Sequence, residues 1–466
     1  MRLPSSCWVS LAGLSLLAFS GASTQADLLV ERQVKPGQKW VAEPTRTLDQ
    51  LKGFKAGSPL LTKYGGRADR RPEGTGFFRV QQVEGRWWFV DPDGGLLLHA
   101  GVTSVAPISK HGSQEAFARL YGSPEKWADA ATRFLRDAGF NGLGAFSNTE
   151  LPRRSAQPMA YTVTLSLAGR FGRQLGITQQ QPGHIGFTGD CLPALHPDFA
   201  AFCDGQAASL AATKEDPWLV GVFSDNELPG KPQMLDHMLA LDAAQPALKP
   251  MREAAWQWFR ARKGNAAEPA QLTDADRAAF LGHVYDTYLR VTTQAIRKHA
   301  PRRLCLGPRF HSPLREAQPV WEAAGRHLDA IAMNYYGTWT PRASDLANWF
   351  KWSGKPCLIT EFYSKGADSG YPNQSGAGWI VRTQADRGRF YQNFTLALLE
   401  SKTCLGWHWL RYIDNDPADT STDPSNRDSN KGLINLRYEP YLPLVDQMRA
   451  VNTNLYRLAD FFDGRK

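Results

Sequence analysis

Two glutamates stand at the ends of apolar segments and could act together as an acid and a nucleophile. Glu227 follows the run WLVGVFSDN, and Glu361 lies in KPCLITEFYSKG. A retaining glycosidase needs one protonated carboxyl for the leaving oxygen and one ionised carboxylate, roughly 5 to 5.5 Å away, to attack the anomeric carbon. Either glutamate alone could equally be a strand-end residue that reaches solvent. The two contexts together favour hydrolysis of a glycosidic bond.

Neighbouring polar side chains fit the same chemistry. Asn226 precedes Glu227 and could donate to the sugar 2-hydroxyl, a bond that strengthens as the oxocarbenium ion develops. Glu227 must be held protonated by apolar surroundings, while Glu361 must stay ionised. Tyr335 and Tyr336 end another apolar run. We expect one of these tyrosines to face the cleft and donate to Glu361, and we favour Tyr336.

Aromatic and basic residues at the ends of two other runs are further candidates for sugar contacts. Trp407 and Trp409 share one face of CLGWHWLRY, and their rings could stack on sugar rings. We expect Trp409 at the scissile bond, Trp407 beneath it, and His408 either in the core or against a sugar. Arg309 and His311 share a side of RLCLGPRFH and could bind hydroxyls or an anionic group.

The rest of the chain alternates strand-like and helix-like segments. Amphipathic helical patterns, such as residues 124–139 and 280–301, separate short apolar runs. This alternation predicts an α/β protein with a closed (β/α)8 barrel, and places Glu227 and Glu361 at the C-terminal ends of the fourth and seventh strands. No Gly-rich loop supports a dinucleotide-binding fold. The eight expected strands are 97–105, 141–148, 160–167, 219–227, 303–311, 330–336, 356–363 and 404–412.

The N-terminal part divides into three regions. Residues 1–26 contain Arg2, an apolar stretch and then small residues, which predicts a secretory signal peptide and export to the periplasm or the medium. A signal anchor is the alternative. Residues 27–75 read as an N-terminal extension and residues 76–466 as the catalytic barrel, entered through a hairpin near residues 84–95. The long segments 228–275 and 365–384 should shape the cleft.

Composition excludes several other classes. The net charge is +9, but the positive residues are scattered, which favours a mildly basic exported protein over a nucleic-acid or polyanion binder. No segment after the N-terminus is free of charges for long enough to span a bilayer. The six cysteines show no metal-binding spacing, and Cys191 with Cys203 is the one pair considered for a disulfide. The acidic run 414–430 reads as a solvated loop, with a calcium site as the alternative.

The sequence resembles the retaining glycoside hydrolases of clan A, and within that clan the β-agarases of glycoside hydrolase family 50. The resemblance covers about residue 75 to the end and is carried by these motifs: WWFVDPDG, FSDNELPG, LGPRF, MNYY with the candidate contact Asn334, ITEFYSKG and GWHWLRYIDND. It implies Glu227 as general acid/base, Glu361 as nucleophile, Asn226 as the 2-hydroxyl donor and no cofactor. One departure is the second strand, where GLGAFSN offers Phe146 and no arginine near the nucleophile.

The residues and the resemblance together predict an exported retaining β-glycosidase. Its substrate would be a polysaccharide or oligosaccharide, with agarose-type β-galactan as the leading expectation, and it would need no cofactor, metal or nucleic acid. Two alternatives come from other classes: a glycan-binding barrel without activity, and a polysaccharide lyase, for which Arg309, His311 and Tyr336 would be the reactive set. The oligomeric state is left open.

Overall fold

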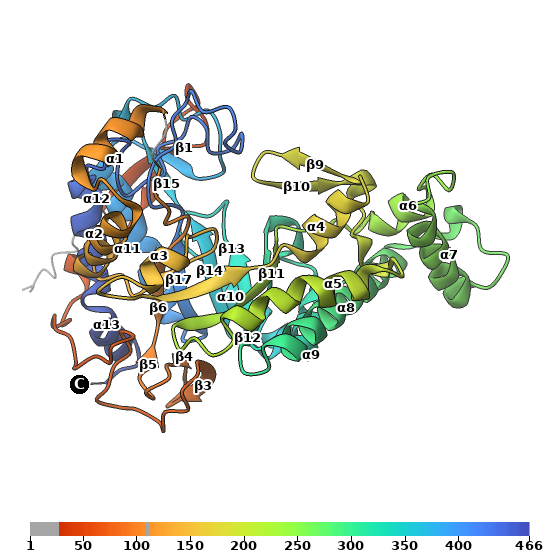
Figure 1. The fold of residues 1–466 in the computed structure, drawn as a ribbon, viewed down its shortest axis with the longest axis horizontal. Coiled ribbons are helices and arrows are strands. Elements are labelled where there is room, and N and C mark those ends of the chain that lie inside the picture. Colours follow the sequence, from red (N-terminus) through yellow and green to blue (C-terminus); the bar gives the residue numbers. More distant parts are fainter. Residues whose placement is uncertain (1–27, 109–110, 466) are drawn as a thin grey trace, which may run out of the picture.

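A closed barrel of parallel strands forms the centre of the computed structural model, which describes residues 28–108 and 111–465. Within these residues, eight strands follow one another around the barrel in chain order, and β17 pairs with β6 to close it (Figure 1). The predicted (β/α)8 fold is confirmed. The predicted signal peptide, residues 1–26, lies outside the described residues. The barrel strands are β6 (His99–Val102), β7 (Gly142–Leu143), β8 (Ala160–Thr164), β11 (Leu219–Asn226), β12 (Leu304–Phe310), β13 (Ile331–Asn334), β14 (Cys357–Phe362) and β17 (Cys404–Trp409).

Amphipathic helices surround the barrel. Their apolar faces pack on the strands, and local signals set their starts: Thr273 and Thr383 each form a capping box with an aspartate three residues later. A break after Asn452 separates the last two helices, α12 and α13. None of the described helices is both long and apolar enough to cross a bilayer. The helices are α1 (Gln114–Leu120), α2 (Pro124–Asp137), α3 (Glu150–Arg153), α4 (Leu167–Gln174), α5 (Phe199–Ala207), α6 (Met234–Leu239), α7 (Lys249–Lys263), α8 (Asp274–His299), α9 (Gln318–His327), α10 (Ala343–Ser353), α11 (Gln384–Glu400), α12 (Leu442–Asn452) and α13 (Leu455–Phe462).

A small antiparallel sheet plugs the N-terminal end of the barrel. It consists of β3 (Arg79–Val83), β4 (Arg86–Val90) and β5 (Leu96–Leu97), so the expected hairpin is confirmed. Phe89 and Leu97 from this sheet join the apolar cluster inside the barrel. A ligand could therefore enter the barrel only from the opposite, C-terminal end.

The N-terminal extension contributes to a sheet near the mouth. Its strands β1 (Leu29–Gln33) and β2 (Val41–Pro44) join β15 (Ser364–Gly366) and β16 (Trp379–Val381) in the order β15-β16-β1-β2. The long segment after β14 is thus ordered by strands from the other end of the chain. Val34 and Lys35, just after β1, reach the cleft described below.

Residues 228–275 do not shape the cleft as the sequence predicted. That segment folds into α6 and α7, which project from one end of the molecule (green in Figure 1), and of its residues only Leu228 lines the cleft. A hairpin that the sequence reading missed, β9 (Thr178–Gln181) and β10 (His184–Phe187), forms that wall instead. A turn between two short polar strands carries little apolar periodicity, which explains the omission.

Candidate active site

A cleft of about 870 Å³ opens at the C-terminal ends of the barrel strands. Glu227, Glu361, Asn226, His311 and Tyr336 all line it. Five of the nine predicted site residues therefore meet in one cleft, although their strands are spread over more than 130 residues of sequence. Cavities of this size accommodate small organic ligands, including short oligosaccharides.

Glu227 is buried at the end of β11. Its backbone adopts φ 48°, a left-handed conformation that a glutamate rarely takes, and its N–H donates to the Arg309 carbonyl at 3.0 Å. Its side chain is 9% exposed, and Oε1 accepts a hydrogen bond from Asn334 Nδ2 at 2.8 Å. Burial, followed by the charge of Glu361, raises the pKa of Glu227 to about 8. This carboxyl is therefore protonated at neutral pH.

Glu361 sits across the cleft in a different environment. Its Oε1 accepts from the guanidinium of Arg309, and its Oε2 accepts from the Tyr336 hydroxyl at 2.6 Å. Burial raises the pKa of Tyr336 well above its ordinary value, so the phenol remains a donor. An arginine and a phenol that both donate to one carboxylate favour its charged form. The two glutamates of this cleft therefore have different partners, an amide for Glu227 and a guanidinium with a phenol for Glu361.

Arg309 is fully buried and does not line the cleft, but it reaches Glu361 because its strand is irregular. Leu304 and Leu306 point into the barrel, and strict alternation would send Arg309 outward. Gly307 adopts φ 70°, and the pairing of β11 with β12 shifts register there. Such a bulge re-aims the residues that follow it, so Arg309 points inward and Phe310 joins the outer core. Arg309 thereby supplies the arginine that the second strand lacks.

Asn226 is held in a single orientation. Its Oδ1 accepts from Arg309 at 2.9 Å and from Asn334 Nδ2 at 3.2 Å. Because arginine can only donate, this contact identifies the amide oxygen. Asn334 is fixed in turn, since its Oδ1 accepts from the Thr360 hydroxyl at 2.8 Å. The NH2 group of Asn226 is consequently the part of this amide that a ligand can use.

The two tyrosines after β13 divide as expected. Tyr336 lines the cleft, while Tyr335 points behind the barrel and donates to Asp345 at 2.6 Å. Asp225 lines the cleft, but its carboxylate is already occupied: it accepts from the N–H groups of Ala168 and Gly169 and from the Tyr288 hydroxyl. Its contacts tie the end of β11 to two helices, a position that suits an orienting residue.

Trp407 and Trp409 lie in the core and not in the cleft where the sequence predicted sugar contacts. They are 1% and 0% exposed and do not line the cleft. Their indole N–H groups donate to the Tyr391 hydroxyl and to the Lys431 carbonyl, on the outer side of the barrel. The expectation that Trp409 forms the sugar platform is wrong; Trp407 is buried as expected, but it too lies away from the cleft.

A second irregular strand explains this error. Leu405 points into the barrel, and regular alternation would turn both tryptophans inward as well. Gly406 adopts φ 138°, and the pairing with β14 shifts register beside it. His408 is the next inward residue, and its ring lies 2.8 Å from His99. Both histidines are fully buried, which settles His408 as a core residue.

His311 lies at the rim of the cleft. Its Nε2 is 3.0 Å from the Leu228 carbonyl, and burial lowers the pKa of the imidazole to about 4. His311 is therefore neutral near pH 7. A neutral imidazole suits hydroxyl groups better than an anion.

The acidic run 414–430 folds down onto the mouth, so the expected solvated loop is also corrected. Asp414 is fully buried and accepts from the N–H groups of Lys431 and Gly432. Asp423 accepts from Gly183 N at 3.0 Å and from Gln180 Nε2 at 2.8 Å. We call this link between the loop and the β9–β10 hairpin the clasp. Within the described residues, no group of three or more acidic, histidine or cysteine side chains could hold a metal ion.

The clasp brings backbone close to the buried acid. A β-carbon on Gly183 would lie 3.9 Å from Glu227 Oε2, so the hairpin turn shields that carboxyl from water. Lys431, from the same loop, lines the cleft and holds its ammonium 4.5 Å from the Tyr363 ring centroid. The sequence reading missed both features because they depend on contacts between segments far apart in the chain. The five cysteines among the described residues, including Cys191 and Cys203, are all unbridged.

Comparisons with known proteins find relatives named β-agarase. The chain is 23% identical to β-agarase B of Vibrio sp. (strain JT0107) over 504 residues, which cover 86% of this chain and 50% of that protein. It is 25% identical to β-agarase A of the same strain, covering 77% of this chain and 39% of the relative. The chain therefore spans about half the length of the curated relatives it matches. No family model matches it.

Among solved structures, one matches nearly the whole length of this chain. A crystal structure described as BpGH50 superposes with a TM-score of 0.82 at 28% identity, covering 94% of this chain and 96% of that one. An exo-β-agarase superposes with a TM-score of 0.70 at 18% identity, covering 88% and 69%, and shows the shared fold. By sequence and by structure, this chain is a relative of the β-agarases of glycoside hydrolase family 50.

Proposed function

We propose that this protein is an exported retaining β-glycosidase that acts on a polysaccharide or oligosaccharide, with agarose-type β-galactan as the leading substrate. The observation that carries the proposal is the contrast between the two glutamates. Glu227 is buried and protonated, with its pKa raised to about 8, while Glu361 is held by Arg309 and Tyr336. Retaining hydrolysis requires this pair of states.

In the first step Glu361 would attack the anomeric carbon while Glu227 donates its proton to the leaving oxygen. The sugar becomes covalently bound to Glu361, and Glu227 is left as a carboxylate. In the second step Glu227 would take a proton from water, which displaces Glu361 and restores both groups. Asn226 would donate its amide to the sugar 2-hydroxyl in both transition states.

The galactan substrate is supported by the relatives, two of which bear the name β-agarase. Because the chain covers about half of each named relative or less, their substrate reaches this protein as a proposal. The buried acid pair also argues against the glycan-binding barrel, because a raised carboxyl pKa costs stability and a binding protein gains nothing from it. The lyase alternative would need a side chain basic enough to abstract a proton from the sugar, and a His311 pKa lowered to about 4 makes that imidazole a weak base.

Purified protein should be incubated with agarose oligosaccharides, porphyran, β-glucans and simple β-galactosides, with new reducing ends as the readout. Proton NMR during the first turnovers should show that the product keeps the anomeric configuration of the substrate. Inversion would contradict the assignment of Glu361 as nucleophile. Binding without turnover would support the glycan-binding barrel, and an unsaturated product end would support the lyase.

A further inference from the structure

Phe146 is exposed at the cleft although it is a large aromatic residue. It is 51% exposed, and among the exposed large hydrophobic side chains of the described residues it is the one aromatic. It follows β7 and lines the cleft together with both glutamates. An exposed aromatic side chain in a cleft costs solvation free energy unless a ligand covers it.

The backbone holds Phe146 in this position against its own preference. Its φ is 62°, in the left-handed region that bulky residues rarely adopt. Hydrogen bonds tie the chain on both sides of it to the segment after β6: Ser104 N donates to the Ala145 carbonyl at 2.9 Å, and Asn148 N donates to the Val105 carbonyl at 2.8 Å. Strain of this kind persists where the surrounding structure imposes it, and such positions cluster at functional sites.

The ring also lies next to the arginine that contacts Glu361. The guanidinium carbon of Arg309 is 4.9 Å from the Phe146 ring centroid, within the range of a cation–π contact. Arg309 in turn donates to Glu361. One part of the ring therefore covers the arginine that holds the nucleophile, and the exposed remainder faces the space where a sugar would react.

We propose that Phe146 is the aromatic surface on which a sugar ring of the bound glycan stacks beside the scissile bond. The inference rests on the proposed glycosidase function. The C3, C4 and C5 hydrogens of a β-galactoside form an apolar patch on one ring face, and such a patch packs on an aromatic ring. This gives to Phe146 the role that the buried tryptophans of β17 cannot have.

Substitutions at Phe146 separate the ring from the unusual backbone. Phe146→Asn keeps a residue that tolerates the left-handed conformation and removes the ring, whereas Phe146→Tyr and Phe146→Trp keep a ring. Stacking contributes to both ground state and transition state, so Phe146→Asn should raise KM about tenfold and leave kcat nearly unchanged. Phe146→Tyr and Phe146→Trp should stay within a few-fold of wild type. Leu120→Asn, at an equally exposed site (50%) on α1, is the matched control.

Binding measurements make the test independent of turnover. In a Glu227→Gln background, the Kd of an agarose hexasaccharide should also rise about tenfold with Phe146→Asn, which corresponds to about 1.4 kcal/mol. An unchanged Kd and KM would overturn the inference, as would a fall in kcat alone, which would mean that the ring serves only to hold Arg309. If wild type hydrolyses no glycan, the proposed function fails, and that result is distinct from an active enzyme that ignores Phe146.

Discussion

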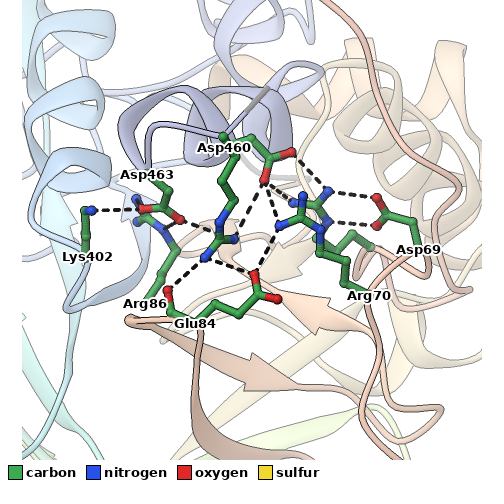
Figure 2. Close-up of polar contacts among 9 residues, drawn as sticks. Asp69, Arg70, Glu84, Arg86, Lys402, Asp460 and Asp463 are labelled. Carbon is green, nitrogen blue, oxygen red and sulfur yellow. Dashed lines mark hydrogen bonds and ion pairs between the residues drawn. The ribbon is translucent and has the colours of Figure 1, made fainter.

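The mouth of the barrel and its opposite end differ in how their carboxylates are paired with cations. At the mouth, Glu227 and Glu361 are both buried, yet only Glu361 receives an arginine. At the opposite end every carboxylate of a dense cluster has at least one cation within 4.0 Å (Figure 2). This paired cluster consists of Arg67, Asp69, Arg70, Glu84, Arg86, Lys402, Asp460, Asp463 and Arg465.

The paired cluster joins the two ends of the chain. Arg67 contacts Asp460 at 2.7 Å, and Arg86 contacts Asp463 through two hydrogen bonds of 2.9 and 3.1 Å. These pairs fasten the segment before the barrel to α13 and the residues after it. A hydrogen bond from Arg67 holds the pKa of Asp69 below its ordinary value, whereas the pKa of Glu227 is raised. One end of the barrel therefore uses charge for structure, and the other keeps an acid in an unfavourable environment that catalysis can use.

The largest effect should come from removing Glu361, the proposed nucleophile. Glu361→Gly should lower kcat by about 10⁴ or more, because no glycosyl-enzyme can form, and azide should restore part of the activity by entering the vacated space. Glu227→Ala should instead keep the first step for aryl glycosides with activated leaving groups, which need no protonation. Rate measurements on both variants check the roles, and the opposite pattern would mean that the two glutamates exchange them.

A substitution in the paired cluster should lower the stability of the fold and leave the kinetic constants unchanged. Arg86→Met removes a fully buried partner of Asp463 and should lower the free energy of unfolding by about 3 kcal/mol, measured by denaturant titration. KM and kcat should stay unchanged in the folded variant. The exposed pair Arg154–Glu150 is the control, since its loss should cost at most about 0.5 kcal/mol. Loss of activity in folded Arg86→Met protein would contradict the separation of the two ends.

The raised pKa of Glu227 predicts a pH-dependent cost. Below pH 4.5 both folded and unfolded states carry the protonated acid; as pH rises towards about 8, the unfolded state releases the proton and the folded state keeps it. Stability therefore falls across this window. Glu227→Gln should remove the fall and gain stability over wild type, by roughly a few kcal/mol at most near pH 8. Melting curves at several pH values test this.

The two glutamates at the mouth should respond in opposite ways to the loss of their charge. Glu361→Gln leaves Arg309 buried without its carboxylate, so this variant should lose stability at neutral pH where Glu227→Gln gains it. Equal responses of the two variants would show that the two glutamates share one electrostatic environment. The activity of wild type should also fall as pH rises through the pKa of Glu227, because the general acid is lost.

The clasp should give the smallest effect. Asp423→Ala releases the hairpin turn beside Glu227, and the water that enters should lower the pKa of Glu227 towards its ordinary value. The basic limb of the pH–activity profile should move to lower pH. The charges of Glu361, Arg309 and Lys431, which also act on Glu227, remain in place. Gln180→Ala removes one clasp bond and should shift the limb less; an unchanged profile in both variants would remove the clasp from this role.

The sequence reading succeeded where the signal was local. The eight strands and most helices were recognised because apolar residues repeat every second or every third to fourth position, and this periodicity depends only on neighbours in the chain. The positions of Glu227 and Glu361 followed, since parallel strands of a barrel place their C-terminal ends on one face. The β9–β10 hairpin escaped detection because its two short polar strands carry little apolar periodicity. The pairing of β1 with β16 escaped detection because the partners lie hundreds of residues apart.

The direction of individual side chains could not be predicted where a strand was irregular. Alternation correctly put Trp407 and Trp409 on one face, which in a regular strand would be the inner one, but a bulge at Gly406 turned them outward. The bulge at Gly307 had the opposite consequence for Arg309 and brought it to Glu361. A glycine inside an apolar strand was the available signal in both places.

The sequence by itself determined the barrel and the two glutamates at its mouth, because periodicity and strand ends are local properties of the chain. The tertiary structure alone decided that Glu227 is protonated and Glu361 is paired. A carboxyl pKa depends on which groups exclude water and which charges stand nearby. For these two residues, those groups come from Asn334, Arg309 and the clasp, each brought from a different part of the chain by the fold.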